Sequence, residues 1–222
     1  MSRLVTGLCA AFVIMLSSLA RADENPTYSG PENASEIAFV HSIQADLMKR
    51  FPTAADAEKA GYVRYTDVDN TGAISYANLH WVSADSKHPS QLWYDTSGNL
   101  LGADFSVLAT STTRPQLWGI NPGRWAEFDG HIHWVTKDPS SGKLTYDLWL
   151  PNDKFVAAGG DVKDPSADTL VKLGKVKAAS DVQTIFEFPG IWDLIVWVKP
   201  NPNGAFAEKN PNVVTTSTKS GM

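Results

Sequence analysis

Apolar residues recur at helical spacing in the first part of the chain and at strand spacing in most of the rest. From Ser35 to Phe51-Pro52, apolar side chains return every three or four residues, at Ile37, Val40, Ile43, Leu47 and Met48. This period predicts a helix with one inward face. A second, short helix is predicted over 53–61, because Thr53 is a typical N-cap and Gly61 a typical helix end.

After this point the pattern changes to that of β-hairpins. Three segments each place a polar, glycine-bearing turn between runs rich in valine and aromatic residues: VRYTDVDNTGAISYANLHWV (63–82), QLWYDTSGNLLGADFSVL (91–108) and HIHWVTKDPSSGKLTYDLWL (131–150). They predict an antiparallel sheet. IWDLIVWV (191–198) is apolar at nearly every position, which predicts a strand buried on both faces.

Two further helical segments are predicted between these strands. Asp164-Pro165 has the form of an N-cap followed by proline at the first helical position, so a helix is expected from there to about Gly174. Ser180 and Gln183 have the spacing of a capping box, which predicts a helical turn over 181–186.

Together these elements predict a single α+β domain over 33–213, with N-terminal helices followed by a mostly antiparallel β-sheet. Residues 23–32 are polar and contain Pro26 and Pro31, so we expect a flexible leader. Residues 214–222 are rich in Thr, Ser and Lys and are expected to be a disordered tail. No internal repeat or linker divides the sequence.

The first 22 residues predict a secretory signal peptide of a bacterial protein. Arg3 precedes the apolar run 4–19, and Ala20-Arg21-Ala22 has the small-x-small form of a cleavage site. The mature protein is therefore expected in the periplasm or outside the cell. No later stretch approaches about 18 consecutive apolar residues, so no membrane span is expected after signal removal.

Charge and cysteine content narrow the possible partners. The formal net charge is −5, which argues against nucleic acid as a partner. The one cysteine, Cys9, falls inside the predicted signal, so a mature chain would have no disulfide and no thiolate ligand. Any metal ion would be held by histidine, carboxylate or carbonyl groups. Nothing in the sequence indicates the oligomeric state.

The end of the chain resembles a known group of proteins. WDLIVWVKPNPNGAFAEKNPNV (192–213) is similar to the C-terminus of exported bacterial proteins that share a K-P-N-P-x-G-x-F-A…N-P pattern; HPSQLWYDTSGNLLGADFSV (88–107) and FPTAADAEKAGY (51–62) also resemble them. The group has no established function, so the resemblance implies none. Its members often carry a histidine in the strand before K-P-N-P, where this sequence has Ile195.

The segment FDGHIHWV (128–135) carries the most conspicuous possible chemistry. His131 and His133 are two residues apart on a predicted strand, so both side chains should point to one face. Imidazole suits zinc and copper, and such a pair supplies two ligands. Further ligands are expected from His80, His88, Glu127 or His41, the last placed on the inward stripe of the first helix. The alternative is a solvated strand face and a core histidine at position 41.

The segment DVDNTGAISYAN (67–78) partly matches a calcium-binding loop. Asp67, Asp69, Thr71 and Gly72 match its positions 1, 3, 5 and 6, but Asn78 stands where the bidentate glutamate belongs. A hairpin turn at 69–72 accounts for the same residues without an ion. We therefore expect the turn.

Eight tryptophans offer a second kind of site. Trp118 and Trp125 lie in RPQLWGINPGRW (114–125), whose prolines and glycines predict an irregular loop, so these two are candidates for binding a ligand. Most of the tryptophans are expected to be sheet core.

The sequence thus favours transition-metal binding, with zinc or copper as the cofactor. The alternatives are an aromatic-lined small-molecule or carbohydrate-binding protein and a metal-dependent enzyme that uses the same histidines. Motifs of serine hydrolases, phosphate-binding loops and H-E-x-x-H metalloproteases are absent from the sequence.

Overall fold

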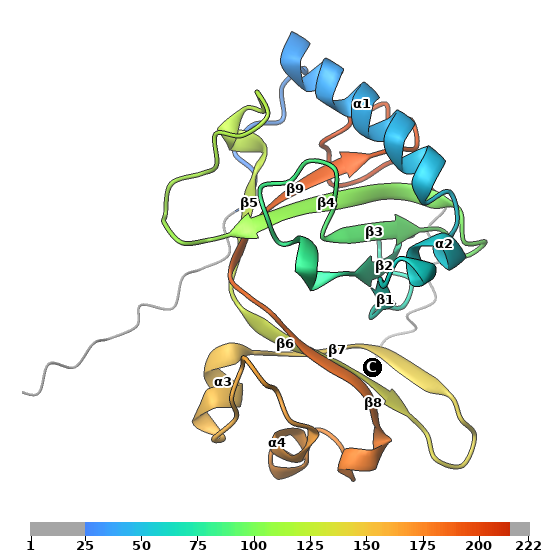
Figure 1. Ribbon diagram of the computed structural model, residues 1–222, viewed down its shortest axis with the longest axis vertical. Helices are drawn as coiled ribbons and strands as arrows, with labels where there is room; N and C mark the ends of the chain where they lie inside the picture. Colours follow the sequence, from blue (N-terminus) through green and yellow to red (C-terminus); the bar gives the residue numbers. More distant parts are fainter. Residues whose placement is uncertain (1–24, 214–222) are drawn as a thin grey trace, which may run out of the picture.

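The computed structural model describes residues 25–213, which form two antiparallel sheets in the orders β1-β2-β3-β4-β9-β5 and β7-β6-β8. Helix α1 (Ala34–Arg50) covers the larger sheet, and α3 (Asn152–Ala157) and α4 (Ala167–Lys172) cover the far side of the smaller one (Figure 1). The predicted α+β fold is confirmed. The predicted signal peptide with Cys9, and the tail 214–222, lie outside the described residues.

The remaining elements complete the two sheets and their connections. The larger sheet contains β1 (Val63–Arg64), β2 (Ile74–Ala77), β3 (Gln91–Tyr94), β4 (Leu100–Leu108), β5 (Ala126–Phe128) and β9 (Ile191–Trp197). The smaller sheet contains β6 (His131–Lys137), β7 (Leu144–Pro151) and β8 (Val182–Phe188). The connections include α2 (Ala54–Lys59) and the 3₁₀ helices η1 (Leu79–Trp81), η2 (Pro122–Arg124) and η3 (Ala179–Asp181). Within residues 25–213, no helix combines the length and apolar character of a membrane span.

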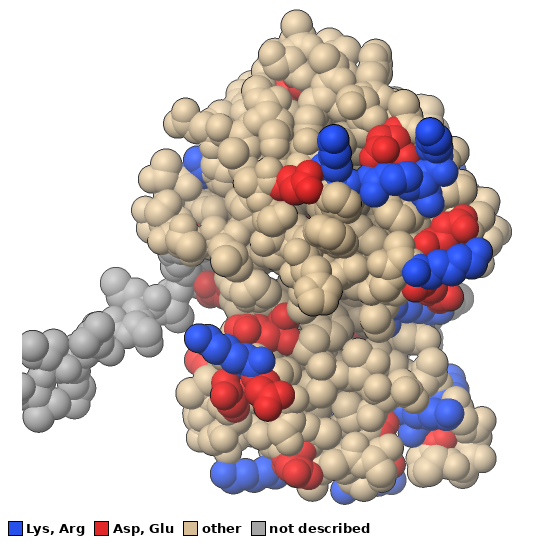
Figure 2. Space-filling model, in the orientation of Figure 1, with Lys and Arg blue, Asp and Glu red and all other residues tan. Residues whose placement is uncertain are grey.

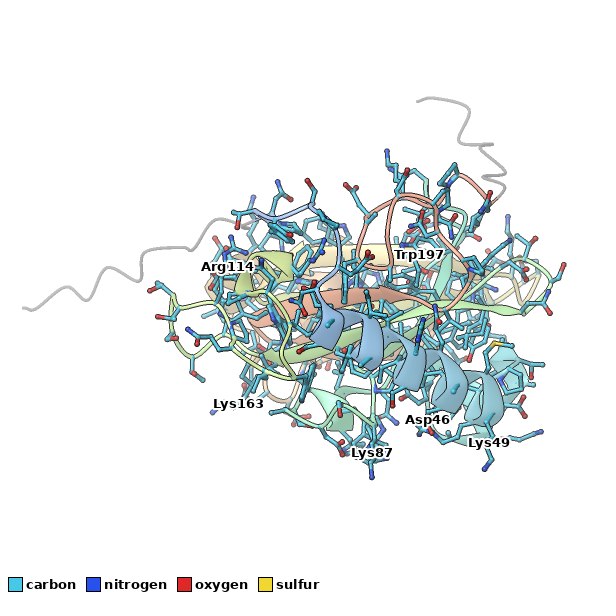
Figure 3. The ribbon with its side chains drawn as sticks, turned by 90° about the horizontal axis from the view of Figure 1, so that it is seen from above. Asp46, Lys49, Lys87, Arg114, Lys163 and Trp197 are labelled. Carbon is cyan, nitrogen blue, oxygen red and sulfur yellow. The ribbon has the colours of Figure 1, made fainter. Side chains whose placement is uncertain are left out.

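Helix α1 begins at a capping box and lies diagonally across the larger sheet (Figure 3). Asn33 Oδ1 accepts from the Glu36 backbone N–H at 3.0 Å, and Glu36 Oε2 accepts from the Asn33 N–H at 2.9 Å. The buried face consists of Glu36, Val40, Ile43 and Leu47. Ile37 and Met48, predicted to face inward, are 45% and 52% exposed, because the stripe in contact with the sheet starts one residue earlier.

All three predicted hairpins form, as β1–β2, β3–β4 and β6–β7. In the turn of the first, the Asp69 N–H donates to the Ala73 carbonyl at 3.0 Å, and Asp69 Oδ1 accepts from Thr71 N–H at 2.7 Å. Gly72 has φ +81°, a conformation that favours glycine. The turn prediction for 67–78 is confirmed, and the carboxylate of Asp69 is already engaged by that turn.

Two local predictions were wrong in the region before β9. The expected helical turn over 181–186 is instead the end of η3 and most of β8. Pairing of β8 with β6 outweighs the local capping signal, because valine, isoleucine, threonine and phenylalanine favour strands. The helix expected from Asp164 begins later, with Ser166 as its N-cap. Helix α3 was not predicted.

The chain crosses between the sheets twice, from β5 to β6 and from β8 to β9 (Figure 1). Gly130 lies at one crossing and Gly190 at the other. A Cβ atom at Gly130 would overlap the side-chain amide of Asn152 and lie 3.3 Å from the Gly190 nitrogen. A larger residue at position 130, directly before the two histidines, would therefore have to displace the Asn152 side chain.

Each sheet buries its outer face under helices. Under α1 the larger sheet contributes Leu92, Ala103, Phe105, Leu194 and Val196. Under α3 and α4 the smaller sheet contributes Ile132, Trp134 and Leu150. Strand β9 is buried on both faces apart from Ile195, as predicted. The inner faces of the two sheets are therefore left to face each other.

Residues 25–32 form no helix or strand, but the N–H groups of Thr27 and Tyr28 both donate to the Gly123 carbonyl, at 2.8 and 3.0 Å. The prediction of a flexible leader missed these contacts.

On the face seen in Figure 2, acidic and basic side chains are interspersed over both parts of the molecule.

Candidate ligand-binding site between the two sheets

The inner face of the larger sheet carries polar residues in the middle of otherwise apolar strands. On β4, Asp104 and Ser106 alternate with Phe105, which faces α1. In the register of β4 with β9, Ser106 pairs with Asp193 and Asp104 with Ile195. Both aspartates therefore lie on the same face of the sheet, on neighbouring strands.

Hydrogen bonds hold these two carboxyl groups in place. Trp93 Nε1 donates to Asp104 Oδ2 at 2.8 Å, and Ser106 Oγ donates to Asp193 Oδ1 at 2.6 Å. Ser90 Oγ lies 2.5 Å from Ser106 Oγ and fixes that hydroxyl in turn. Asp104 and Asp193 are only 5% and 6% exposed, so the surrounding protein groups determine the pKa values of these carboxyl groups.

Burial and mutual repulsion favour the protonated form of this pair. Burial raises the pKa of Asp193 to about 6, opposed by the hydrogen bonds from Ser106 and Asp104. Burial, followed by the charge of Asp193, raises the pKa of Asp104 well above its usual value. Asp104 Oδ1 is buried and has no hydrogen-bond partner among the described residues. At neutral pH the pair thus carries one proton and one negative charge.

A cavity of about 330 Å³ adjoins the acid pair. Its aromatic lining comes from both sheets and the segment before β2: Tyr65, Trp93, Phe128, Phe188 and Trp197. Trp93 and Trp197 meet edge to face, with ring centroids 5.3 Å apart. His131 also lines this cavity. Apolar walls with a few buried polar groups are typical of sites for small organic molecules.

His131 and His133 do point to one face of β6, as predicted, with ring centroids 4.8 Å apart. They lie on the inner face of the smaller sheet among aromatic rings. The ring of His133 meets Tyr65 edge to face, with ring centroids 4.7 Å apart, and stacks on Phe186, with ring centroids 5.7 Å apart. It is 9% exposed, so the alternative of a solvated strand face is wrong for His133.

The environment of His133 strongly favours the neutral ring. Burial, and then the nearby His131, lowers the pKa of His133 to about 3, although a backbone hydrogen bond with Leu148 opposes this. His133 Nδ1 is buried and has no hydrogen-bond partner among the described residues. His131 Nδ1 lies 2.7 Å from the Asp129 carbonyl oxygen. Because a carbonyl only accepts, His131 Nδ1 carries a proton, and the neutral tautomer of this ring has its lone pair on Nε2.

The other predicted ligands do not join this pair. His41 is exposed on α1, one residue away from the buried Val40, so its placement on the inward stripe was wrong. His80 is exposed on η1. His88 stacks on Trp81 with ring centroids 4.0 Å apart, and its Nδ1 lies 2.7 Å from Asp85 Oδ2.

Glu127, the carboxylate among the predicted ligands, does not join His131 and His133 either. Glu127 pairs with Trp192 on β9, so its side chain is on the opposite face from Asp193. Within residues 25–213, no group of three or more His, Cys, Asp and Glu side chains is arranged to hold a metal ion. The zinc or copper prediction therefore depends on two histidines.

Trp118 and Trp125 lie in the core beneath α1 and line neither of the cavities beside the histidines. Trp118 stacks on Phe39 with ring centroids 5.4 Å apart, and Trp125 is fully buried. The irregular loop was correctly expected, but its tryptophans point inward, because hydrogen bonds from Asn121 and Arg124 to Glu36 hold the loop against α1. Their predicted role in ligand binding does not agree with this placement.

The sequence analysis did not identify Asp104 and Asp193 as site residues. The signal was present, because a carboxylate inside an apolar run such as IWDLIVWV is more informative than an exposed charge. Recognising the pair required the register of β4 and β9, which the sequence does not display. In comparisons with known proteins, no family model, no curated protein and no solved structure matches this chain.

Proposed function

We propose that this protein binds a small organic molecule in the cavity between its two sheets. The observation that supports the proposal best is the buried pair of Asp104 and Asp193 beside an aromatic-lined space of about 330 Å³. Burying two carboxyl groups destabilises a fold unless they gain partners, so sites of this kind are typically retained for function. The proposed function is thus small-molecule binding, but at a site different from the one predicted at Trp118 and Trp125.

The proposal is tested by screening small organic molecules for a rise in melting temperature. A ligand that binds only the native state stabilises it according to its concentration and affinity. Ser75 lines the cavity and is 8% exposed, so Ser75→Leu should fill part of the space and abolish the stabilisation. Ser42→Leu is the matched control, because Ser42 is exposed on α1. Ligands that stabilise both variants equally would place binding outside the cavity and contradict the proposal.

A second candidate function is binding of zinc or copper by His131 and His133. It is favoured by the hydrogen bonds that leave one lone pair on each ring: Nε2 of His131 and the buried Nδ1 of His133. Metal-ligating histidines typically donate their other N–H to a carbonyl or carboxylate in this way. A second cavity of about 560 Å³, bordered by both rings, Trp149 and Pro151, would leave room for water or an added ligand to complete the coordination.

Titration calorimetry of tag-free protein with ZnCl₂ and CuCl₂ tests this candidate. Binding should be weakened at least tenfold by His131→Gln and by His133→Gln, because one remaining imidazole holds an ion poorly. His80→Gln is the control, since His80 is exposed on η1. If the parent and all three variants bind alike, these two histidines are not the ligands. A metal-dependent enzyme that uses the same pair would require this binding first.

We also propose export to the periplasm or the medium, on the basis of the signal-like residues 1–22. The mature chain should then begin at Asp23, and the intact mass of the secreted form measures this directly. A cellular product that retains residues 1–22 would contradict export.

A further inference from the structure

We infer that the ligand of the inter-sheet cavity carries a positively charged nitrogen, as in a protonated amine or a quaternary ammonium group. This inference rests on the proposed function and specifies the class of ligand. It follows from three features of the cavity: the charge of its lining, the free oxygen of a buried carboxyl group, and its aromatic walls.

The lining of the cavity is acidic. Four carboxyl groups border it, those of Asp69, Asp104, Asp193 and Glu208. Among the described residues that line the cavity, none is Lys or Arg, and the other titratable side chains are Tyr65 and His131. A cleft with walls of low dielectric strengthens the attraction of such a lining for a cation.

The buried carboxyl pair has capacity to accept a further hydrogen bond. Trp93 occupies Asp104 Oδ2 and Ser106 occupies Asp193 Oδ1, at 2.8 and 2.6 Å. Asp104 Oδ1 accepts from no other described side chain, although the residue is only 5% exposed. Neither carboxyl group forms an ion pair with a Lys or Arg of the described chain. A cationic ligand would therefore supply the counter-charge that the protein itself lacks.

Aromatic faces and edges surround the same space. Tyr65, Phe128 and Phe188 border it together with the Trp93–Trp197 pair. Trp197, which is labelled in Figure 3, is the last residue of β9 in the sheet beneath α1. Tryptophan, tyrosine and phenylalanine rings attract organic cations through their π-systems, and a carboxylate among such rings is a common solution for ammonium groups.

An inorganic cation fits this lining less well. Calcium takes six to eight oxygen ligands, and magnesium needs near-octahedral coordination. The carboxyl groups that line the cavity do not form a group of three suited to a metal ion within residues 25–213. The large aromatic surface would also lie unused around a small hydrated ion.

Matched ligands separate the effect of charge from the effect of shape. Choline and 3,3-dimethylbutan-1-ol have nearly the same shape, as do benzylamine and benzyl alcohol, but only the first of each pair is cationic at pH 7.5. Titration calorimetry with the parent protein should give at least tenfold tighter binding of the cation in one or both pairs. Asp193→Asn should reduce the preference to less than threefold, whereas Asp153→Asn, an exposed control on α3, should retain it.

Each other result contradicts the inference in a distinct way. Equal binding of neutral and cationic members would overturn the charge assignment and leave the cavity as a ligand site. If none of the four compounds binds, the assignment to organic cations is wrong. The proposed function is tested separately, by the wider ligand screen with Ser75→Leu. Asp193-dependent binding of CaCl₂ or ZnCl₂ in place of the amines would make the site an inorganic one. If Asp193→Asn does not fold, judged by circular dichroism, Asp104→Asn replaces it with the same expected loss.

Discussion

Asp104 and Asp193 lie diagonally across the pair formed by β4 and β9, with Asp193 opposite Ser106, two residues along β4 from Asp104. Side chains in this diagonal relation are close enough to interact when they share a face. Burial and the repulsion between them raise the pKa of both carboxyl groups, which favours protonation within the pair. The stability of the fold should consequently depend on the protonation of this pair.

The first prediction concerns Asp193→Asn. Burial raises the pKa of Asp193 from 3.8 to about 6, so between these values the folded state binds more protons than the unfolded state. Stability contributed by protonation is present below about pH 4 and is lost as the pH rises to about 6. Between pH 4 and pH 7 the unfolding free energy of Asp193→Asn should therefore fall by less than that of the parent protein, with a difference on the order of 1–3 kcal/mol. Urea denaturation at pH 4 and pH 7 measures this loss for the parent and the variant.

The exposed Asp153 provides the control for that experiment. Asp153→Asn should leave the difference in unfolding free energy between pH 4 and pH 7 as it is in the parent protein. An Asp193→Asn protein with the parent's pH dependence would show that Asp193 titrates as an ordinary exposed aspartate.

The second prediction concerns His133→Phe, and it has the opposite sign. Burial, with a contribution from His131, lowers the pKa of His133 from 6.5 to about 3. Between these values the unfolded state binds more protons, so stability is present above about pH 6.5 and is lost as the pH falls. His133→Phe should lose less stability on acidification, by up to about 1.4 kcal/mol per pH unit. Denaturation curves at pH 7.5 and pH 5.5 give the comparison. Equal losses in both proteins would mean that His133 is protonated within the fold.

The third prediction concerns the buried ion pair between α1 and η2. Arg124 Nε donates to Glu36 Oε1 at 3.2 Å, and the Glu36 side chain is fully buried. Arg124→Met should cost about 3–5 kcal/mol of unfolding free energy, because it leaves a buried carboxylate without its cation. Arg50→Met, which breaks the more exposed pair with Asp46, should cost less than about 1 kcal/mol. Similar costs for the two variants would contradict the structural importance of Glu36–Arg124.

The helices and hairpins could be predicted because their signals are local. Thr53, Gly72 and the alternating strands of 91–108 each specify a conformation within a few residues. The direction in which a side chain points was harder to predict: His41 lies one position from a buried residue, and a shift of one residue on a helix is about 100°. Local capping at Ser180 was likewise outweighed by long-range pairing of β8 with β6.

The candidate site depended on information that no single segment contains. His131 and His133 were recognisable because their spacing alone places them on one face. Asp104 and Asp193 come together only through the register of two strands far apart in the chain. The inward direction of Trp118 and Trp125 similarly depends on how η2 packs beneath α1.

The most direct test of the cavity as a ligand site is a titration of ¹⁵N-labelled protein with benzylamine, followed through the indole N–H signals of its tryptophans. Trp93 and Trp197 line the cavity, whereas Trp118 and Trp125 lie in the core under α1. We predict saturable shifts of the Trp93 and Trp197 signals, with Trp118 and Trp125 unchanged, and loss of these shifts in Ser75→Leu. Shifts confined to Trp118 and Trp125, or shifts that persist unchanged in Ser75→Leu, would contradict a ligand site between the two sheets.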